Sequence, residues 1–281
     1  NKEFESKLFY SYELVGDSDN IKSIIDQINK ISVSESRIFI NGPAGSGKEL
    51  IARKIHKESK RQKSPFVVLN GALLDNKKYE LELFGEEKEN GSISYGALEK
   101  SSKGILLIDE IIEIPLDTQS KILRVLIDQK FKRVNGNHDI NVDVRIICSS
   151  SKDIKKEIEN GNFREDLYHR LNVFDINIDP LKDRVSDISL LVEYFSEKIS
   201  TNYNLKKLSI DTNNKYLLNY DWPGNVRELR NLIERIAILS PDSNDKISNI
   251  IKESLKTPDI KIAPSENSLS IPLKEARENF E

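Results

Sequence analysis

Apolar positions along this chain form two kinds of pattern, short continuous runs and stripes with helical spacing. The runs predict buried strands at 37–41, 66–70, 104–109, 142–148 and 173–178. The stripes predict helices near 18–31, 47–60, 76–84, 116–129, 152–159 and 164–170. Because buried strands that alternate with helices pair in parallel, we expect an α/β fold, a parallel sheet wrapped by helices.

After Pro180 the pattern changes to helical spacing alone. Stretches 186–202, 211–219 and 225–239 predict helices with no strand between them, and therefore a small all-helical subdomain. Asn225 ends a turn and is expected to cap the last of these helices. The expected divisions are a linker from an upstream domain (1–12), an α/β subdomain (13–180), a helical subdomain (181–255) and a linker toward a downstream domain (256–281).

Composition narrows the function classes. The 281 residues include 43 Lys and Arg against 46 Asp and Glu, a net charge of −3, so charge gives no reason to expect nucleic-acid binding by this stretch. Cys148 is the only cysteine, which excludes an internal disulfide and is typical of a reducing, cytoplasmic setting. No apolar run approaches the roughly 18 residues of a membrane span. The chain starts at Asn1 and contains no methionine, so we expect a fragment of a longer protein.

A glycine-rich segment lies between the first predicted strand and the helix that follows it. It reads Asn41-Gly42-Pro43-Ala44-Gly45-Ser46-Gly47-Lys48-Glu49. Glycines let backbone N–H groups curl around phosphates, and the start of a helix adds partial positive charge. Lys48 supplies a charge for the outer phosphates. Glu49 stands where a generic phosphate-binding loop carries Ser or Thr for Mg²⁺, which taken alone weakens the assignment.

A second motif, Gly104–Glu110, predicts a buried strand that ends in two carboxylates. Asp109 is expected to hold Mg²⁺ and Glu110 to orient the attacking water. A glycine turn that binds nothing is the alternative reading of the first motif, but it leaves the acidic strand unexplained. We therefore predict that the chain binds ATP and Mg²⁺ and hydrolyses the ATP.

Five phrases carry a resemblance to a known family. They are Gly47–His56, Glu82–Gly85, Leu106–Ile111, Phe163–Val173 and Trp222–Leu229. Together they resemble the bacterial enhancer-binding proteins of the NtrC family, the AAA+ activators of sigma-54 RNA polymerase, over residues 12–250. The resemblance implies an AAA+ P-loop ATPase with a helical lid. In that family Glu49 is the usual residue after the loop lysine.

The resemblance also implies roles for residues outside the two motifs. Asn70 is similar to the residue that holds the catalytic Glu110 until the nucleotide state changes. Arg227 is similar to the lid arginine that senses the γ-phosphate. The alternative for Arg227 is a charge on the helix surface that faces Glu228 or Asn231.

Arg164 and Arg170 resemble the arginines that reach the ATP of a neighbouring subunit. A guanidinium delivered in this way stabilises charge on the transferring phosphoryl group. The alternative is a surface arginine paired with Glu165 or Asp166. The implied self-assembly is a hexameric or heptameric ring, with a dimer as the inactive form.

Two further positions follow from the same resemblance. The nucleotide base is expected against Val15-Gly16 and the lid. Ser151 aligns with a residue that senses the γ-phosphate, where the family usually has Asn. Because serine is shorter, we expect weaker coupling to the γ-phosphate and slow hydrolysis.

The chain departs from the family at the loop that contacts sigma-54. That loop reads Gly-Ala-Phe-Thr-Gly-Ala after a Glu-Lys pair. Here Glu87-Lys88 is present, but residues 89–95 are fewer than in the family and lack the hexapeptide. Tyr95 is a poor substitute for the aromatic tip, so we expect that the sigma-54 contact is lost.

The missing hexapeptide and the tail 269–281 are similar to the NtrX-type branch of response regulators. This branch implies an upstream receiver that a sensor kinase addresses, a downstream DNA-binding domain, and RNA polymerase holoenzyme as a partner. The leading interpretation is the central ATPase domain of such a regulator. Two alternatives stay open: a nucleotide-gated oligomerisation scaffold with little hydrolysis, and a sigma-54 activator with a degenerate loop.

Overall fold

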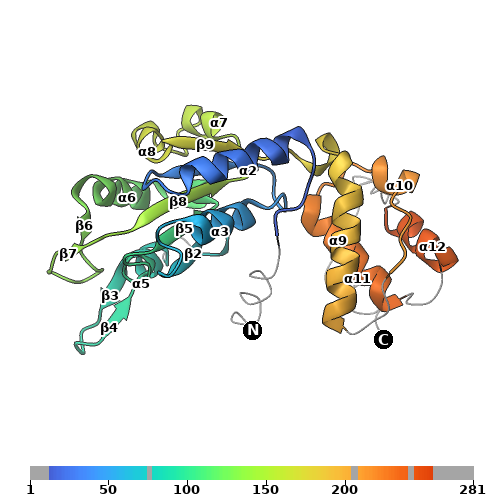
Figure 1. Ribbon diagram of the computed structural model, residues 1–281. Helices are drawn as coiled ribbons and strands as arrows, with labels where there is room; N and C mark the ends of the chain where they lie inside the picture. Colours follow the sequence, from blue (N-terminus) through green and yellow to red (C-terminus); the bar gives the residue numbers. More distant parts are fainter. Residues whose placement is uncertain (1–12, 75–77, 204–207, 240–243, 256–281) are drawn as a thin grey trace, which may run out of the picture.

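A computed structural model describes residues 13–74, 78–203, 208–239 and 244–255 (Figure 1). The expected linkers 1–12 and 256–281 lie outside the described residues. Figure 1 shows a body built on a central sheet and, beside it, a second body made of helices.

The first body contains a five-stranded parallel sheet in the order β2-β5-β8-β1-β9. The strands are β1 (Ile38–Asn41), β2 (Phe66–Asn70), β5 (Ile105–Asp109), β8 (Arg145–Ser150) and β9 (Phe174–Asn177). The expected strand 142–148 is displaced, because β8 starts later and continues through two buried serines. Ser149 donates to the Asp109 carboxylate and Ser150 to the Lys152 carbonyl oxygen, so both hydroxyls are satisfied inside the sheet.

Successive residues of the strands point to opposite faces of the sheet, so the body has two cores. Ile38 and Ile40 pack with helices α2 and α3, whereas Phe39 lies in the core covered by α6 and α8. The covering helices are α2 (Asp19–Ile31), α3 (Lys48–Glu58), α4 (Tyr79–Phe84), α5 (Ala97–Lys100), α6 (Leu116–Asp128), α7 (Ile154–Glu159) and α8 (Glu165–Leu171). Because both faces are covered, the strands read as continuous apolar runs.

Several strands of the sheet have polar residues at their carboxyl-terminal ends. Asn70 lies beside Asp109 in the register of β2 and β5, and Asn41 lies beside Ser150 in the register of β1 and β8. Strands that are distant in sequence thus place polar side chains together at the carboxyl-terminal end of the sheet.

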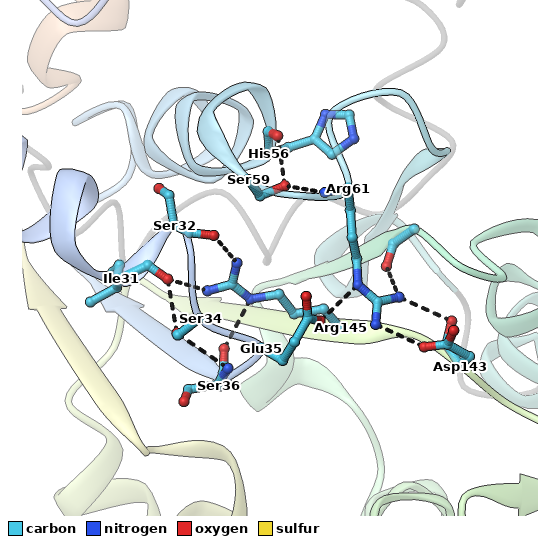
Figure 2. A network of polar contacts seen from close by, with 11 residues as sticks. Ile31, Ser32, Ser34, Glu35, Ser36, His56, Ser59, Arg61, Asp143 and Arg145 are labelled. Carbon is cyan, nitrogen blue, oxygen red and sulfur yellow. Dashed lines mark hydrogen bonds and ion pairs between the residues drawn. The ribbon is translucent and has the colours of Figure 1, made fainter.

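A buried arginine, Arg145, stabilises the opposite end of the sheet, where the strands begin (Figure 2). Arg145 is 2% exposed, and its guanidinium donates to the carbonyl oxygens of Ile31, Ser32 and Ser36 at 2.9, 3.1 and 3.0 Å. Burial lowers the pKa of Arg145 from its ordinary value. The side chain joins β8 to the end of α2 and to the segment that leads into β1.

Two antiparallel hairpins extend from the sheet body at the end remote from the lid (Figure 1). They are β3 (Gly85–Glu87) with β4 (Ile93–Tyr95), and β6 (Lys130–Phe131) with β7 (Ile140–Asn141). The apolar pattern does not predict them, because their strands are very short and mostly polar. Arg133 fastens the second hairpin to the first through an ion pair of 2.9 Å to Glu87, and to helix α5 through one of 2.6 Å to Glu99.

The second body is the helical lid. It contains α9 (Ser186–Tyr203), α10 (Lys215–Leu218), α11 (Asn225–Leu239) and α12 (Asn244–Ser254) around a core that includes the buried Trp222. Helix α10 is much shorter than the expected 211–219, because a turn precedes it and the Asn214 side chain caps its first residues. The apolar pattern does not predict α12, which only a few isoleucines mark in a polar stretch. Within the described ranges, no helix has the length and apolar character to cross a membrane.

Candidate functional site

The glycine-rich loop joins β1 to α3 at the carboxyl edge of the sheet. Gly45 has a φ of 76°, and a Cβ there would lie 2.3 Å from the carbonyl oxygen of Gly224 in the lid. A Cβ on Gly42 would lie 2.1 Å from Cγ2 of Ile178. Both positions need glycine, because neighbouring segments approach the loop backbone closely. Gly42, Pro43, Ala44, Gly45, Ser46 and Gly47, the residues expected at the phosphates, make up this loop.

Lys48 lies at the start of α3 and is almost buried. It is 6% exposed, its Nζ donates to the Gly42 carbonyl oxygen at 2.9 Å, and Nζ lies 3.1 Å from Oε1 of Glu110. The two motifs predicted from sequence therefore meet through a charge pair. A buried pair of this kind holds both groups in place, because losing either partner leaves an uncompensated charge.

Asp109 ends β5, and both oxygens of its carboxylate are held. Nδ2 of Asn70 donates to Oδ2 at 3.0 Å, and the Ser149 hydroxyl donates to Oδ1. The expectation that Asn70 holds Glu110 is wrong for this structure, because the register of β2 and β5 places Asn70 beside Asp109. The fixed carboxylate could hold a small divalent cation that takes its other ligands from phosphate and water.

Glu110 follows in a left-handed backbone conformation, with φ 53° and ψ 52°. Its Oε2 accepts hydrogen bonds from the N–H of Ser151 at 2.9 Å and from the Ser151 hydroxyl at 2.8 Å. Together with Lys48, Ser151 occupies both oxygens of this carboxylate. The expected γ-phosphate sensor is thus the residue that holds Glu110.

Glu49, the residue after the loop lysine, is engaged by its own helix. Its Oε1 accepts from Nη2 and Nε of Arg53 at 2.6 and 2.9 Å. The Arg53 guanidinium in turn lies over the Phe66 ring, 4.9 Å from its centroid. Glu49 therefore stabilises the first turns of α3. These contacts turn its carboxylate toward Arg53 and not toward a cation site.

A cleft of about 470 Å³ lies between the loop, the end of β5 and the lid. Val15 and Phe195 contribute to an apolar end, which suits a nucleotide base, and Arg227 lines the same cleft from the start of α11. Gly16, expected to face the base with Val15, packs instead against the lid. A Cβ on Gly16 would lie 2.8 Å from the carboxylate of Asp187.

Asn225 was expected to cap α11, and this expectation is wrong. Its Oδ1 accepts from the N–H of Leu181 at 2.8 Å, and its Nδ2 donates to the Ala44 carbonyl oxygen at 3.0 Å. The side chain is turned toward the loop because Asn225 itself has a φ of 52°. Glu228 instead holds the residue before the helix, since its Oε2 accepts from the N–H of Gly224 at 2.8 Å.

Two buried residues at the junction of the bodies were not identified from sequence. Arg184 and Asp187 are 3% and 0% exposed, and Nη1 of the arginine lies 3.5 Å from Oδ2 of the aspartate. Burial lowers the pKa of Arg184, and the nearby Asp187 carboxylate opposes this shift. The only signal in the sequence is an Arg and an Asp three residues apart at the start of a predicted helix.

Arg164 and Arg170 lie at α8, away from the residues that line the cleft in the described part of the chain. Arg164 pairs with Asp166 through two contacts of 3.0 and 2.7 Å, which is the surface pairing of the alternative interpretation. This pair lowers the pKa of Asp166 from its ordinary value. Arg170 donates weakly to the Leu126 carbonyl oxygen at 3.5 Å. Delivery of either arginine to a neighbour stays a prediction.

Comparison with known proteins identifies the family of this chain. Residues 14–177 match the family described as the sigma-54 interaction domain, and residues 182–263 match the AAA+ ATPase lid domain. The nitrogen assimilation regulatory protein NtrX of Azorhizobium caulinodans is 41% identical over 285 residues, which cover 98% of this chain and 62% of that protein. The regulatory protein AtoC of Escherichia coli is 41% identical over 232 residues, covering 81% of this chain and 50% of AtoC. The chain therefore spans less than two thirds of the length of these relatives.

Solved structures give the same result. NtrX from Brucella abortus in complex with ATP superposes with a TM-score of 0.83 at 39% identity, covering 99% of this chain and 63% of that one. Its complex with ADP gives a TM-score of 0.81 at 40% identity, with 99% and 64% covered. The predicted fold, a parallel α/β sheet wrapped by helices and followed by a helical lid, is confirmed. The resemblance to NtrC-family regulators and to their NtrX-type branch is confirmed as well.

Proposed function

Because this chain belongs to the sigma-54 interaction domain family and carries an AAA+ lid, we propose that it binds ATP with Mg²⁺ and hydrolyses the ATP to control transcription. The observation that carries the proposal is the meeting of Lys48, Asp109 and Glu110 at one end of a cleft whose other end is apolar. The relatives solved with ATP and with ADP support it, since they share 39% and 40% identity with this chain.

The side chains suggest how hydrolysis proceeds. Lys48 exchanges its contact with Glu110 for phosphate oxygens, which frees one oxygen of that carboxylate. Asp109, oriented by Asn70, fits Mg²⁺. When bound, this ion neutralises phosphate charge. Glu110 then accepts a hydrogen bond from the attacking water and orients it, and Arg227 contacts the nucleotide from the lid.

Neighbouring subunits complete the proposed site. Arg164 and Arg170 are placed on the surface of α8, where a second copy of the chain can reach them. Arg164 must leave Asp166 to do so, and the cost is small because exposed ion pairs contribute little to stability. The proposed active form is a hexameric or heptameric ring, and the inactive form is a dimer.

Contact with sigma-54 is proposed to be lost. The segment between β3 and β4 closes as a tight hairpin, with the N–H of Lys88 donating to the Ser92 carbonyl oxygen at 2.9 Å and that of Gly91 to the Lys88 carbonyl oxygen at 2.8 Å. Such a short turn presents no extended loop. Co-purification with sigma-54 in ATP-, ADP- and transition-state-analogue-bound forms tests this, and binding in any of them would restore the alternative of an activator with a degenerate loop.

The relatives support a proposal for the role of the whole protein. We propose a cytoplasmic response regulator whose receiver is addressed by a sensor kinase, and which acts on RNA polymerase holoenzyme while bound to DNA. The support is the similarity to NtrX over 98% of this chain.

The test of the proposed activity is the ATPase rate per subunit as a function of protein concentration, compared with Arg164→Ala. A rate that climbs with concentration and collapses in the variant is expected for a site completed by a neighbour. Lys132→Ala, an exposed basic residue of the β6–β7 hairpin segment, is the control for removal of a surface charge.

A second candidate function is a nucleotide-gated scaffold with little hydrolysis. It is favoured by the two hydrogen bonds that hold Glu110 to Ser151 and by the pairing of Arg164 with Asp166. A flat or absent rate despite tight ATP binding is the outcome that would support it.

A further inference from the structure

The lid is hydrogen-bonded to three consecutive peptide groups of the phosphate loop. The carbonyl oxygens of residues 44, 45 and 46 accept, in that order, from Nδ2 of Asn225 at 3.0 Å, from the N–H of Arg227 at 3.2 Å and from Nη2 of Arg184 at 3.1 Å. Two of the three donors are side chains. We call Arg184 and Asn225 the lid clamp.

The lid clamp determines which way the loop N–H groups point. In a trans peptide the C=O of one residue and the N–H of the next point in opposite directions, and the described residues contain no cis peptide. Holding the carbonyls of Ala44 and Ser46 toward the lid therefore turns the N–H groups of Gly45 and Gly47 to the other side of their peptide planes. N–H groups of this kind are the donors with which such a loop cradles phosphate.

Both members of the lid clamp are fixed by burial and by further bonds. Asn225 is 2% exposed, and since its Oδ1 accepts from the N–H of Leu181, its amide nitrogen must face the loop. Arg184 is 3% exposed and also donates to the Asp179 carbonyl oxygen at 3.2 Å. A buried donor that loses its acceptor is costly, so neither side chain can turn away unless the lid moves.

The same segment of the lid holds the chain beside the apolar end of the cleft. Asp187, the partner of Arg184, accepts from the N–H groups of Asp17 and Ser18 at 2.7 and 2.8 Å and from the Ser18 hydroxyl at 2.8 Å. Only Gly16 separates these residues from Val15. One buried network thus connects the phosphate loop, the lid and the segment that carries the wall of the base pocket.

We infer that Arg184 and Asn225 are positioning residues for the nucleotide phosphates, acting through the peptide groups of the loop and not by touching the nucleotide. The inference rests on the proposed nucleotide site and adds a regulation to it. The loop is shaped to bind phosphate only while the lid is seated, so phosphate affinity reports the position of the lid.

The test compares ADP with adenosine, which carries the base and ribose without phosphates. Asn225→Asp keeps the size of the side chain and the acceptor for Leu181, but it places a carboxylate oxygen against the Ala44 carbonyl oxygen. Arg184→Lys keeps the positive charge beside Asp187 but loses the fork that reaches several acceptors at once. Asn219→Asp, exposed in the lid at the end of α10, controls for the added negative charge.

Affinities are measured by competition against a fluorescent nucleotide, using the full chain. We expect ADP to bind about tenfold more weakly to Asn225→Asp and to Arg184→Lys, the effect of one or two lost hydrogen bonds. The affinity of both variants for adenosine, and that of Asn219→Asp for both ligands, are expected to stay within about twofold of the values for the unaltered chain.

Two outcomes overturn the inference. Unchanged ADP affinity in both variants means that the lid clamp does not shape the loop. A parallel loss for ADP and adenosine means that the lid has only loosened as a whole. Circular dichroism shows whether Asn225→Asp folds. If it does not, the ADP and adenosine affinities of Arg184→Lys alone test the inference. Failure of the unaltered chain to bind ADP would instead refute the proposed function itself.

Discussion

Ser151 holds Glu110 through two hydrogen bonds, one from its N–H at 2.9 Å and one from its hydroxyl at 2.8 Å. The serine lies just beyond β8, and the glutamate just beyond β5, so the pairing of neighbouring strands brings them together. With Lys48 on its other oxygen, this carboxylate is fully engaged in the structure. Orienting a water requires that one of these contacts be given up.

Removing the Ser151 hydroxyl is therefore expected to speed hydrolysis. Ser151→Ala deletes one of the two hydrogen bonds that hold Glu110. Because such a bond contributes about 1 kcal/mol net, we expect turnover to rise about fivefold. Steady-state turnover at saturating ATP measures this, with the exposed Ser102→Ala as the matched control. A fall in turnover would show that the hydroxyl acts on the nucleotide and does not restrain Glu110.

Glu110→Gln is expected to separate binding from turnover. The amide keeps the size of the side chain but cannot accept a proton from water, so turnover falls by about 10² to 10⁴ while ATP still binds. Single-turnover measurements with radiolabelled ATP check both quantities. Asp117→Asn, exposed in the first turn of α6, should behave like the unaltered chain. Unchanged turnover in Glu110→Gln would remove this residue from the catalytic role.

Lys48→Ala is expected to abolish ATP binding. The substitution removes the charge that faces the phosphates and leaves Glu110 without its ion pair in a partly buried place. Calorimetric titration with ATP is the measurement, and Lys57→Ala, exposed near the end of the same helix, is the control. Nucleotide affinity retained in Lys48→Ala would contradict the proposed site.

Replacing Arg145, which lies far from the proposed nucleotide site, is expected to lower the stability of the fold strongly. Arg145→Met leaves three carbonyl oxygens without their donor, so the free energy of unfolding should fall by about 2 to 4 kcal/mol. Arg124→Met, whose side chain is 84% exposed, should change it by less than about 0.5 kcal/mol. Urea denaturation followed by circular dichroism gives both values. A similar loss in the two variants would mean that the buried contacts of Arg145 contribute nothing specific.

Cys148 offers a built-in probe of unfolding. The thiol is fully buried, and burial raises its pKa far above the ordinary value, so at pH 8 it stays protonated and protected in the folded protein. We expect Ellman's reagent to label it only as the chain opens, and saturating ADP to slow the labelling about a hundredfold or more, as ligand binding to the folded state requires. Rapid labelling without denaturant would show that β8 opens locally.

The sheet and the two motifs could be predicted because each depends on neighbouring residues. Buried parallel strands are marked by uninterrupted apolar runs, as in Ile105–Asp109, and the loop is marked by its glycines. The β3–β4 and β6–β7 hairpins lack such a signal, because their few strand residues are mostly polar and gain stability from Arg133.

The partners of the site residues could not be predicted, because they depend on register and on contacts across the chain. Asn70 was assigned to Glu110, whereas the pairing of β2 with β5 gives it to Asp109. Asn225 was assigned to its own helix, whereas its side chain bonds a loop residue 181 positions away. No local pattern reports contacts of this range.

The left-handed backbone at Glu110 adds a local cost to the folding free energy at the centre of the site. A residue with a side chain costs about 1 kcal/mol in this conformation, and glycine adopts it without that cost. Glycine at position 110 would remove that cost, but it would also leave the almost buried Lys48 without its ion pair. The backbone strain is therefore balanced by the charge pair, and the carboxylate that balances it is the same one that the proposed hydrolysis must release from Lys48.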